Sequence, residues 1–98
     1  MNIKIHSIKF DAGDDLLDYI QRKMDKMDKF FDRIVDGEVY LRLNNEGTEN
    51  KTVEIKINLP GDQFFIESSA RSFEKAMDDS SKALKRKLRK HKEKLVTH

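Results

Sequence analysis

The residues best suited to chemistry are the cations between Lys82 and Lys94. This stretch carries eight cations and one anion, Glu93, for a net charge of +7. The cations are Lys82, Lys85, Arg86, Lys87, Arg89, Lys90, Lys92 and Lys94. Ammonium and guanidinium groups at this density attract polyanions, and the phosphates of nucleic acids are the commonest polyanion in a cell. The run therefore predicts a surface that binds nucleic-acid phosphates.

The rest of the chain has the opposite charge. Residues 1–81 contain twelve cations and seventeen anions, a net of −5, although the 98 residues together carry only +2. Solubility would be served equally well by mixed signs, so this concentration of positive charge favours a nucleic-acid partner. A solvated lysine-rich face is the simplest alternative. A membrane surface or a calmodulin-like partner is a weaker one, because the apolar residues of the run are needed for the core and include no Trp.

No pattern in the sequence is typical of an enzyme or a metal site. The chain lacks cysteine, a nucleotide-binding glycine loop, an elbow serine and a zinc-protease helix. His6, His91 and His98 are scattered, and the carboxylates stand at capping or ion-pair spacings. We predict a non-enzyme without metal, cofactor or small-molecule substrate. An acid–base nuclease using His6 or His91 is an alternative that no partner group at a useful spacing supports.

The spacing of apolar residues places the basic run on a helix. Residues 72–95 carry apolar or small side chains three and four positions apart, which is typical of an amphipathic helix with one buried stripe. The stripe consists of Phe73, Met77, Ser80, Leu84, Leu88, His91 and Leu95. We expect His91 to be half-buried with one ring edge in solvent; an RNA contact is the second interpretation.

Strands and a further helix are predicted upstream. Alternating polarity predicts strands at residues 38–44, 52–59 and 64–67. It also predicts a first strand at residues 3–10, with a phase slip at Ser7 and an irregular exit. A helix between the first two is predicted by the spacing of Leu16, Leu17, Ile20, Met24, Met27 and Phe31. The order β-α-β-β-β-α predicts an α+β fold of two layers, a four-stranded sheet with both helices on one face, in a single domain over residues 1–98. The sequence shows no signal peptide or membrane-spanning segment, so we expect a cytoplasmic protein.

The polar side of the first helix is also divided by charge. Asp18, Asp25, Asp28 and Asp32 fall on one flank. Lys23, Lys26 and Lys29 turn toward the other. Because both helices cover the same sheet face, these lysines can extend the basic surface, and we include them among the RNA-binding residues. Periodicity leaves open whether their flank faces the second helix.

A motif of the C-terminal helix is specific to one family. Its residues are Ala76-Met77-Asp78, then Leu84, Arg86, Leu88, Lys90-His91-Lys92 and Lys94-Leu95. They resemble the closing helix of the ribosome hibernation promoting factor family, also called ribosome-associated inhibitor or protein Y, which runs approximately A-I-D and then K-L-x-R-Q-L-x-K-x-K-x-K-L. The run Leu16–Ile20 and the turn at Leu59-Pro60-Gly61 also fit, so the resemblance covers the whole chain. Lys82, Ala83 and Lys87 depart from it, replacing an acid, a lysine and a glutamine.

The resemblance implies a short-form factor without the linker and dimerisation domain of longer relatives. It implies binding to the rRNA of the small ribosomal subunit, in the channel between head and body, where the domain overlaps the path of mRNA and of the A- and P-site tRNAs. Translation would then be blocked in starved or stationary-phase cells, and a separate partner factor could pair ribosomes into dimers. A general double-stranded RNA-binding module, and an assembly or protein-interaction factor using the polar sheet face, are the alternatives.

Overall fold

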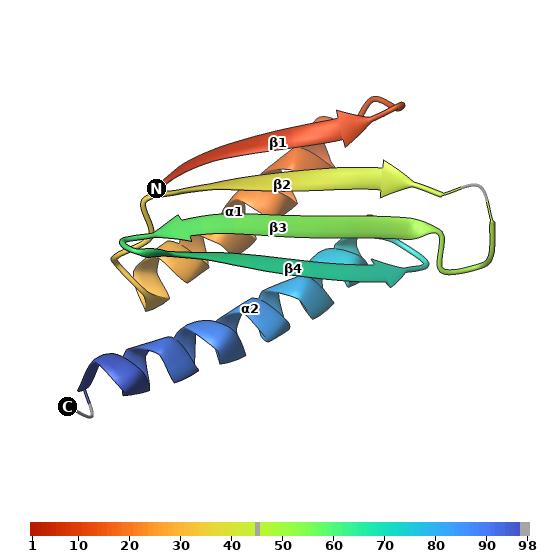
Figure 1. The fold of residues 1–98 in the computed structure, drawn as a ribbon. Helices are drawn as coiled ribbons and strands as arrows, with labels where there is room; N and C mark the ends of the chain where they lie inside the picture. The colour runs from red at the N-terminus through yellow and green to blue at the C-terminus, as the bar shows by residue number, and fades with distance from the viewer. Residues whose placement is uncertain (45, 97–98) are drawn as a thin grey trace.

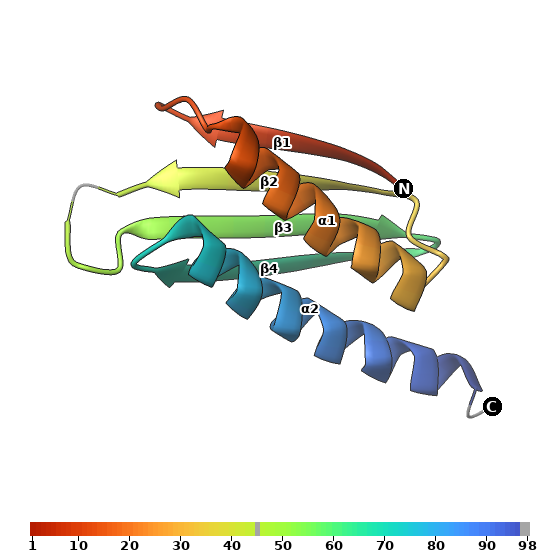
Figure 2. The same ribbon diagram turned by 180° about the vertical axis from the view of Figure 1, so that it is seen from behind.

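The computed structural model describes residues 1–44 and 46–96. The elements follow the order β1 (Asn2–Ile8), α1 (Asp14–Phe30), β2 (Asp36–Leu43), β3 (Lys51–Leu59), β4 (Asp62–Ala70) and α2 (Phe73–Val96). The strands stand in the sheet in the same order, with β1 parallel to β2 and the other pairs antiparallel. Both helices cover one face of the sheet (Figures 1 and 2). The predicted two-layer α+β fold is confirmed.

Alternation of side chains along the strands separates the core from an open face. On the helix side, Val39 pairs with Ile55 and Leu41 with Val53, and all four are fully buried. The intervening side chains form the open face, as the alternation predicted. They include Lys4, His6, Tyr40, Arg42, Glu54 and Lys56.

The first strand is shorter than its sequence pattern predicted. It ends at Ile8, because Lys9 has a φ of 66° in the left-handed region and turns the chain. The turn brings Phe10 back to the core, where its ring stacks on Phe73 with 5.0 Å between the centroids. This contact joins the entry of α1 to the first turn of α2.

The first helix begins without a side-chain cap and ends before its last predicted core residue. Gly13 is the N-cap and makes no side-chain cap bond, whereas Asp14 and Asp15 place negative charge at the positive end of the helix dipole. The helix ends at Phe30. Phe31, predicted on its apolar face, therefore lies just beyond the helix but is still buried.

The fourth strand is longer than predicted. It runs over nine residues, although Ser68, Ser69 and Ala70 at its end are poor strand formers. Each of them pairs with β3, and the hydroxyl of Ser69 lies 2.7 Å from that of Thr52. The turn before it has Gly61 at a φ of +76°, as the third position of a type II turn requires.

The second helix buries the predicted stripe and projects past the sheet. Met77, Ser80, Leu84 and Leu88 are fully buried, so truncating either leucine to alanine should cost about 2–5 kcal/mol. The side chain of Leu95 lies outside the described residues. Figure 1 shows the C-terminal end of α2 extending beyond the turn between β3 and β4. No helix in the described part of the chain is both long and apolar enough to span a membrane.

Candidate nucleic-acid interface

All eight predicted cations of α2 are exposed, while the leucines between them are buried. They lie on the solvent side of the C-terminal half of the helix. Within residues 1–44 and 46–94, and leaving Glu93 aside, no carboxylate forms an ion pair within 4.0 Å of any of them. Apart from any cation that interacts with Glu93, their charge is therefore available to an external anion.

A groove between the two helices, the interhelix groove, joins cations of both. Lys23 and Lys26 line it from α1, and Lys82 and Lys85 from α2. The basic flank of α1 thus faces the basic helix, which periodicity alone had left open. Lys29 is exposed in the last turn of α1 but does not line the groove. The structure therefore brings two of the three predicted α1 lysines to α2.

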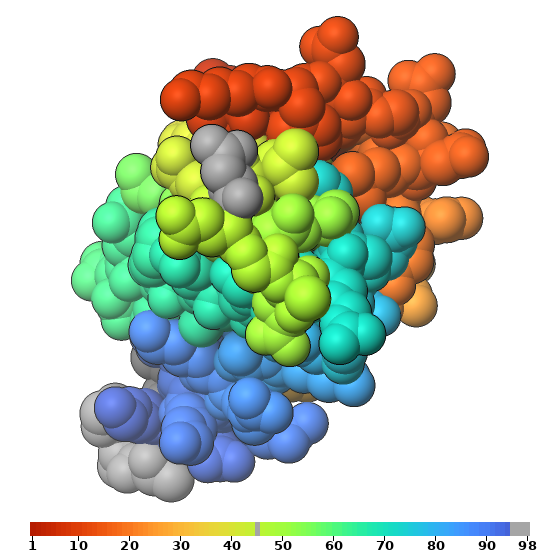
Figure 3. Space-filling view, turned by 90° about the vertical axis from the view of Figure 1, so that its right-hand side faces the viewer, coloured from red at the N-terminus to blue at the C-terminus, as the bar shows by residue number. Residues whose placement is uncertain are grey.

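The acidic flank of α1 faces the opposite direction. The carboxylate of Asp28 accepts a hydrogen bond from the α-amine of Met1 at 2.9 Å, which directs this flank toward the start of β1. Asp18 and Asp25 on the same flank are exposed. Seen along its long axis in Figure 3, the molecule has β1 at one edge and α2 as a ridge at the other. The acidic flank of α1 and the basic surface of α2 therefore face different directions.

One anion, Asp78, lies within the interhelix groove. The hydroxyl of Tyr19 donates a short hydrogen bond to its carboxylate, and the amine of Lys23 lies 3.0 Å from the same oxygen. The Tyr19 hydrogen bond, assisted by Lys23, holds the pKa of Asp78 below its ordinary value. Hydrogen bonding to Asp78 in turn raises the pKa of both Tyr19 and Lys23. Lys23 stays charged but is paired, so it is less available to phosphate than Lys26.

An aromatic ring at the end of α1 supports two lysines of α2. The amines of Lys85 and Lys92 lie 5.1 Å and 5.0 Å from the centre of the Phe30 ring, within cation–π range. Lys92 also donates to the backbone carbonyl of Phe30 at 3.4 Å. Phe30 was not among the predicted RNA-binding residues. Its position one turn after Lys26 is the signal that could have placed it on the basic flank.

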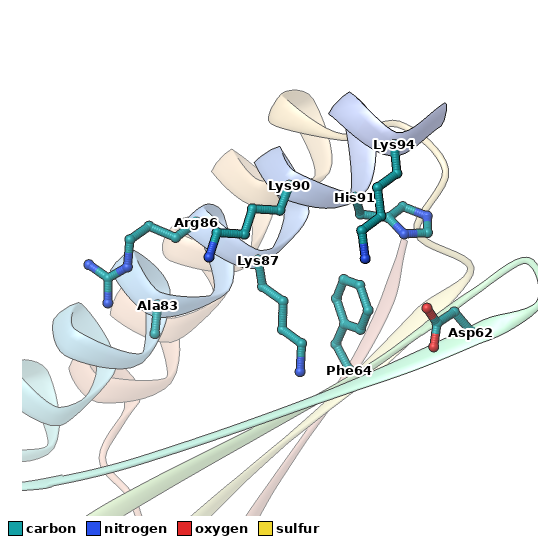
Figure 4. A pocket seen from close by; sticks show the side chains of 8 residues that line it. All are labelled: Asp62, Phe64, Ala83, Arg86, Lys87, Lys90, His91 and Lys94. Atoms are coloured by element: carbon teal, nitrogen blue, oxygen red, sulfur yellow. The ribbon is translucent and has the colours of Figure 1, made fainter. Parts of the chain in front are cut away.

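A second groove, the hairpin groove, lies on the other side of α2, between this helix and the β3–β4 hairpin (Figure 4). Its aromatic residues are Phe64 and His91, which meet edge to face at 5.5 Å. His91 also contacts Phe31 at 5.7 Å and is half-buried, as predicted. The other polar residues that line the groove are Asp62, Arg86, Lys87, Lys90 and Lys94. The hairpin groove thus combines four of the predicted RNA-binding cations with Phe64, which the sequence did not place among them.

The open face has a different electrostatic character. The ring of Tyr40 stacks on His6 at 4.8 Å and its hydroxyl donates to Glu38. Arg42 lies 5.9 Å from the same ring and forms an ion pair with Glu54 at 2.9 Å. Opposite charges thus compensate each other within this face. The Tyr40 ring already contacts His6 and Arg42.

The described residues also bear on the predicted absence of a metal site. In residues 1–44 and 46–96, no three His, Cys, Asp or Glu side chains cluster as metal ligands would. His98 lies outside the described residues.

Comparison with known proteins identifies the family. Residues 3–96 match the sigma 54 modulation protein / S30EA ribosomal protein family. The chain belongs to this family. The S30EA chain is 28% identical to the ribosome hibernation promotion factor of Bacillus subtilis over 95 residues, which are 97% of this chain but 50% of that protein. It therefore spans half the length of that relative.

Other relatives match the S30EA chain end to end. The ribosome hibernation promoting factor of Klebsiella oxytoca is 28% identical over 98 residues, covering 100% of this chain and 98% of that protein. Among solved structures, a ribosomal subunit interface protein from Coxiella burnetii superposes with a TM-score of 0.85 at 21% identity, over 94% of this chain and 98% of that one. The S30EA chain and the Coxiella protein share the fold described above.

Proposed function

We propose that this S30EA-family protein is a ribosome hibernation factor, which binds the small ribosomal subunit through α2 and halts translation while bound. The observation that carries the proposal is the set of eight exposed cations on one helix. Leaving Glu93 aside, no carboxylate of the described residues forms an ion pair with any of these cations. Relatives named as ribosome hibernation factors support this role. We expect the protein to act in the cytoplasm, where ribosomes translate. The role is binding rather than catalysis.

The shape of the basic surface suits folded RNA. Thirteen helical residues span about 20 Å, so the cations from Lys82 to Lys94 can contact several successive phosphates. Contacts to phosphate fix position and orientation without reading sequence, and folded RNA is recognised largely by shape. Lys26 in the interhelix groove widens this surface toward α1.

The finer part of the proposal follows the family resemblance. The domain would occupy the channel between the head and body of the small subunit in stationary phase or starvation. There it would exclude mRNA and the A- and P-site tRNAs, and a separate partner factor could pair the silenced ribosomes.

Competition on purified small subunits tests this proposal. Binding of the protein should be lost when mRNA and initiator tRNA fill the channel first, because the sites overlap. The same protein should reduce translation of a reporter mRNA in a cell extract. Simultaneous binding of protein, mRNA and tRNA to one subunit, with translation unchanged, would refute the proposed site and role together.

A further inference from the structure

We propose that the hairpin groove binds an unpaired nucleotide of RNA, with its base against Phe64 and His91 and its phosphates at the surrounding lysines. This inference rests on the proposed RNA-binding function. It adds a second mode of contact, because the rest of α2 meets phosphates alone whereas this groove takes a base that has left its stack.

A surface lysine lies over the aromatic ring at the base of the groove. Phe64 belongs to the hydrophobic core and is only 7% exposed, and the amine of Lys87 lies over its ring at 4.9 Å from the centroid. Lys87 is exposed and its stem is flexible, so the amine can move aside. A base that takes its place would stack on the ring, and the displaced cation would remain beside the phosphate. Aromatic stacking combined with cations is the usual way in which proteins bind single-stranded nucleic acid.

The charges around the groove give the bound nucleotide a direction. Figure 4 shows the amines of Lys87 and Lys94 beside the Phe64 ring, with Lys90 and Arg86 further along α2. Asp62, the one acid among the described residues that line the groove, lies at the hairpin end. A carboxylate repels phosphate but accepts hydrogen bonds from the amino and imino groups of a base. The phosphates therefore belong at Lys90 and Arg86, and the edge of the base belongs near Asp62.

The size of the groove also fits a nucleotide. Its volume is about 460 Å³. Sites for small ligands usually measure roughly 300–1,000 Å³. The short side chain of Ala83 lines the groove as well and leaves room beside Arg86 and Lys87.

The interhelix groove provides the contrast within the same molecule. It also combines lysines with an aromatic ring, Phe30. However, the Asp78 carboxylate already pairs with Lys23 there, and two lysines, Lys85 and Lys92, lie over the Phe30 ring. We expect that groove to contact the phosphates of paired RNA and to have no preference for an unpaired base.

The test compares two RNA hairpins that differ by one bulged nucleotide. The full chain is titrated into each hairpin, and affinity is measured by fluorescence anisotropy at one salt concentration. A 2-aminopurine at the bulge reports on stacking. The wild-type protein should bind the bulged hairpin roughly tenfold more tightly than the paired one, with a change in 2-aminopurine emission.

Three variants locate the effect. Phe64→Leu should lose the preference while its affinity for the paired hairpin is unchanged, because no charge is altered. His91→Gln, at a half-buried position on the helix, should also lose it, which covers the case in which Phe64→Leu fails to fold. Phe30→Leu is the matched control and should keep the preference. Equal affinity of the wild-type protein for both hairpins, or a preference that survives in folded Phe64→Leu or His91→Gln, would overturn the inference.

The same variants separate this inference from the proposed function. If only the nucleotide site is wrong, the protein will still bind small subunits in competition with mRNA and tRNA. If the proposed function is wrong, that competition will fail whatever the hairpins show.

Discussion

Asp78 joins α1 to α2 at the point where the basic surface begins. Its carboxylate accepts a hydrogen bond from the hydroxyl of Tyr19 and forms an ion pair with Lys23, and its side chain is only partly exposed. The folded state therefore favours the ionised form, and the pKa of Asp78 lies below its ordinary value. A carboxyl group of this kind stabilises the fold above its unfolded pKa, and that contribution is lost as the pH falls through its folded pKa.

We predict that Asp78→Asn lowers the free energy of unfolding by about 1 kcal/mol at pH 7, because an amide loses the ion pair but can still accept the Tyr19 hydrogen bond. The difference from wild type should shrink as the pH is lowered below the ordinary carboxyl range, where Asp78 becomes protonated in both states. Urea unfolding at pH 7 and at acidic pH measures it. A difference that is constant with pH would show that the charge of Asp78 does not contribute.

The contacts among Tyr19, Lys23 and Asp78 could not be predicted from local sequence patterns. The eight cations and their exposure followed from helical spacing, because charged residues avoid the buried stripe. The contact between Tyr19 and Asp78 spans 59 positions, and no local pattern reports such a pair. The contact between Phe64 and His91 was likewise not predictable, because it depends on how β4 packs against α2.

At the scale of the element, α2 combines a packed stripe with a repulsive surface. Four pairs of cations stand four positions apart: 82–86, 85–89, 86–90 and 90–94. Each such pair destabilises a helix by about 0.2–0.5 kcal/mol at low salt. The packing of Met77, Leu84 and Leu88 outweighs this repulsion and keeps the cations in one rigid array.

We therefore predict that the protein becomes more stable as salt is raised from very low concentration to about 0.15 M, where the Debye length is about 8 Å. Screening should raise the free energy of unfolding by about 1 kcal/mol, seen as a melting temperature higher by about 4–8 °C. Lys90→Gln removes two of the four pairs, so it should melt higher than wild type at low salt and respond less to added salt.

Lys75→Gln is the control, for which we expect the opposite change in melting temperature at low salt. Lys75 forms an ion pair with Asp79 at 2.9 Å, so its neutralisation should lower the melting temperature at low salt. A wild-type melting temperature that stays flat or falls with salt would contradict the account of α2.

Most helices and strands were predictable because apolar residues recur in each of them with a clear helical or strand spacing. The ends of these elements were less predictable, because they depend on contacts with residues distant in the sequence. The left-handed Lys9 ends β1 early, and pairing with β3 extends β4 through two serines. Periodicity also could not decide how α1 is rotated against α2, which the contact of Lys23 with Asp78 now shows.

At the scale of the whole molecule, the densest positive charge lies on one helix of an elongated body of 47 × 24 × 19 Å. The ridge of α2 lies at one edge, and the acidic flank of α1 turns away from it toward β1. The protein should consequently approach a polyanion with α2 foremost, and the acids should discourage binding in other orientations.

The decisive measurement is cosedimentation of two charge-reversed variants with purified small subunits. One variant replaces Lys85, Arg86, Arg89 and Lys90 by glutamate. The matched control replaces Lys4, Lys9, Lys51 and Arg71 by glutamate, which changes the net charge equally but leaves the cations of α2 in place. Circular dichroism first confirms that both variants fold.

We predict that the α2 variant no longer sediments with the subunit, whereas the control binds nearly as well as wild type. The binding constant of the wild type should also fall by roughly 0.7–0.9 log units per phosphate contact for each tenfold rise in salt. If the α2 variant still sediments with small subunits, or if both variants lose binding alike, then α2 is not the surface that meets ribosomal RNA.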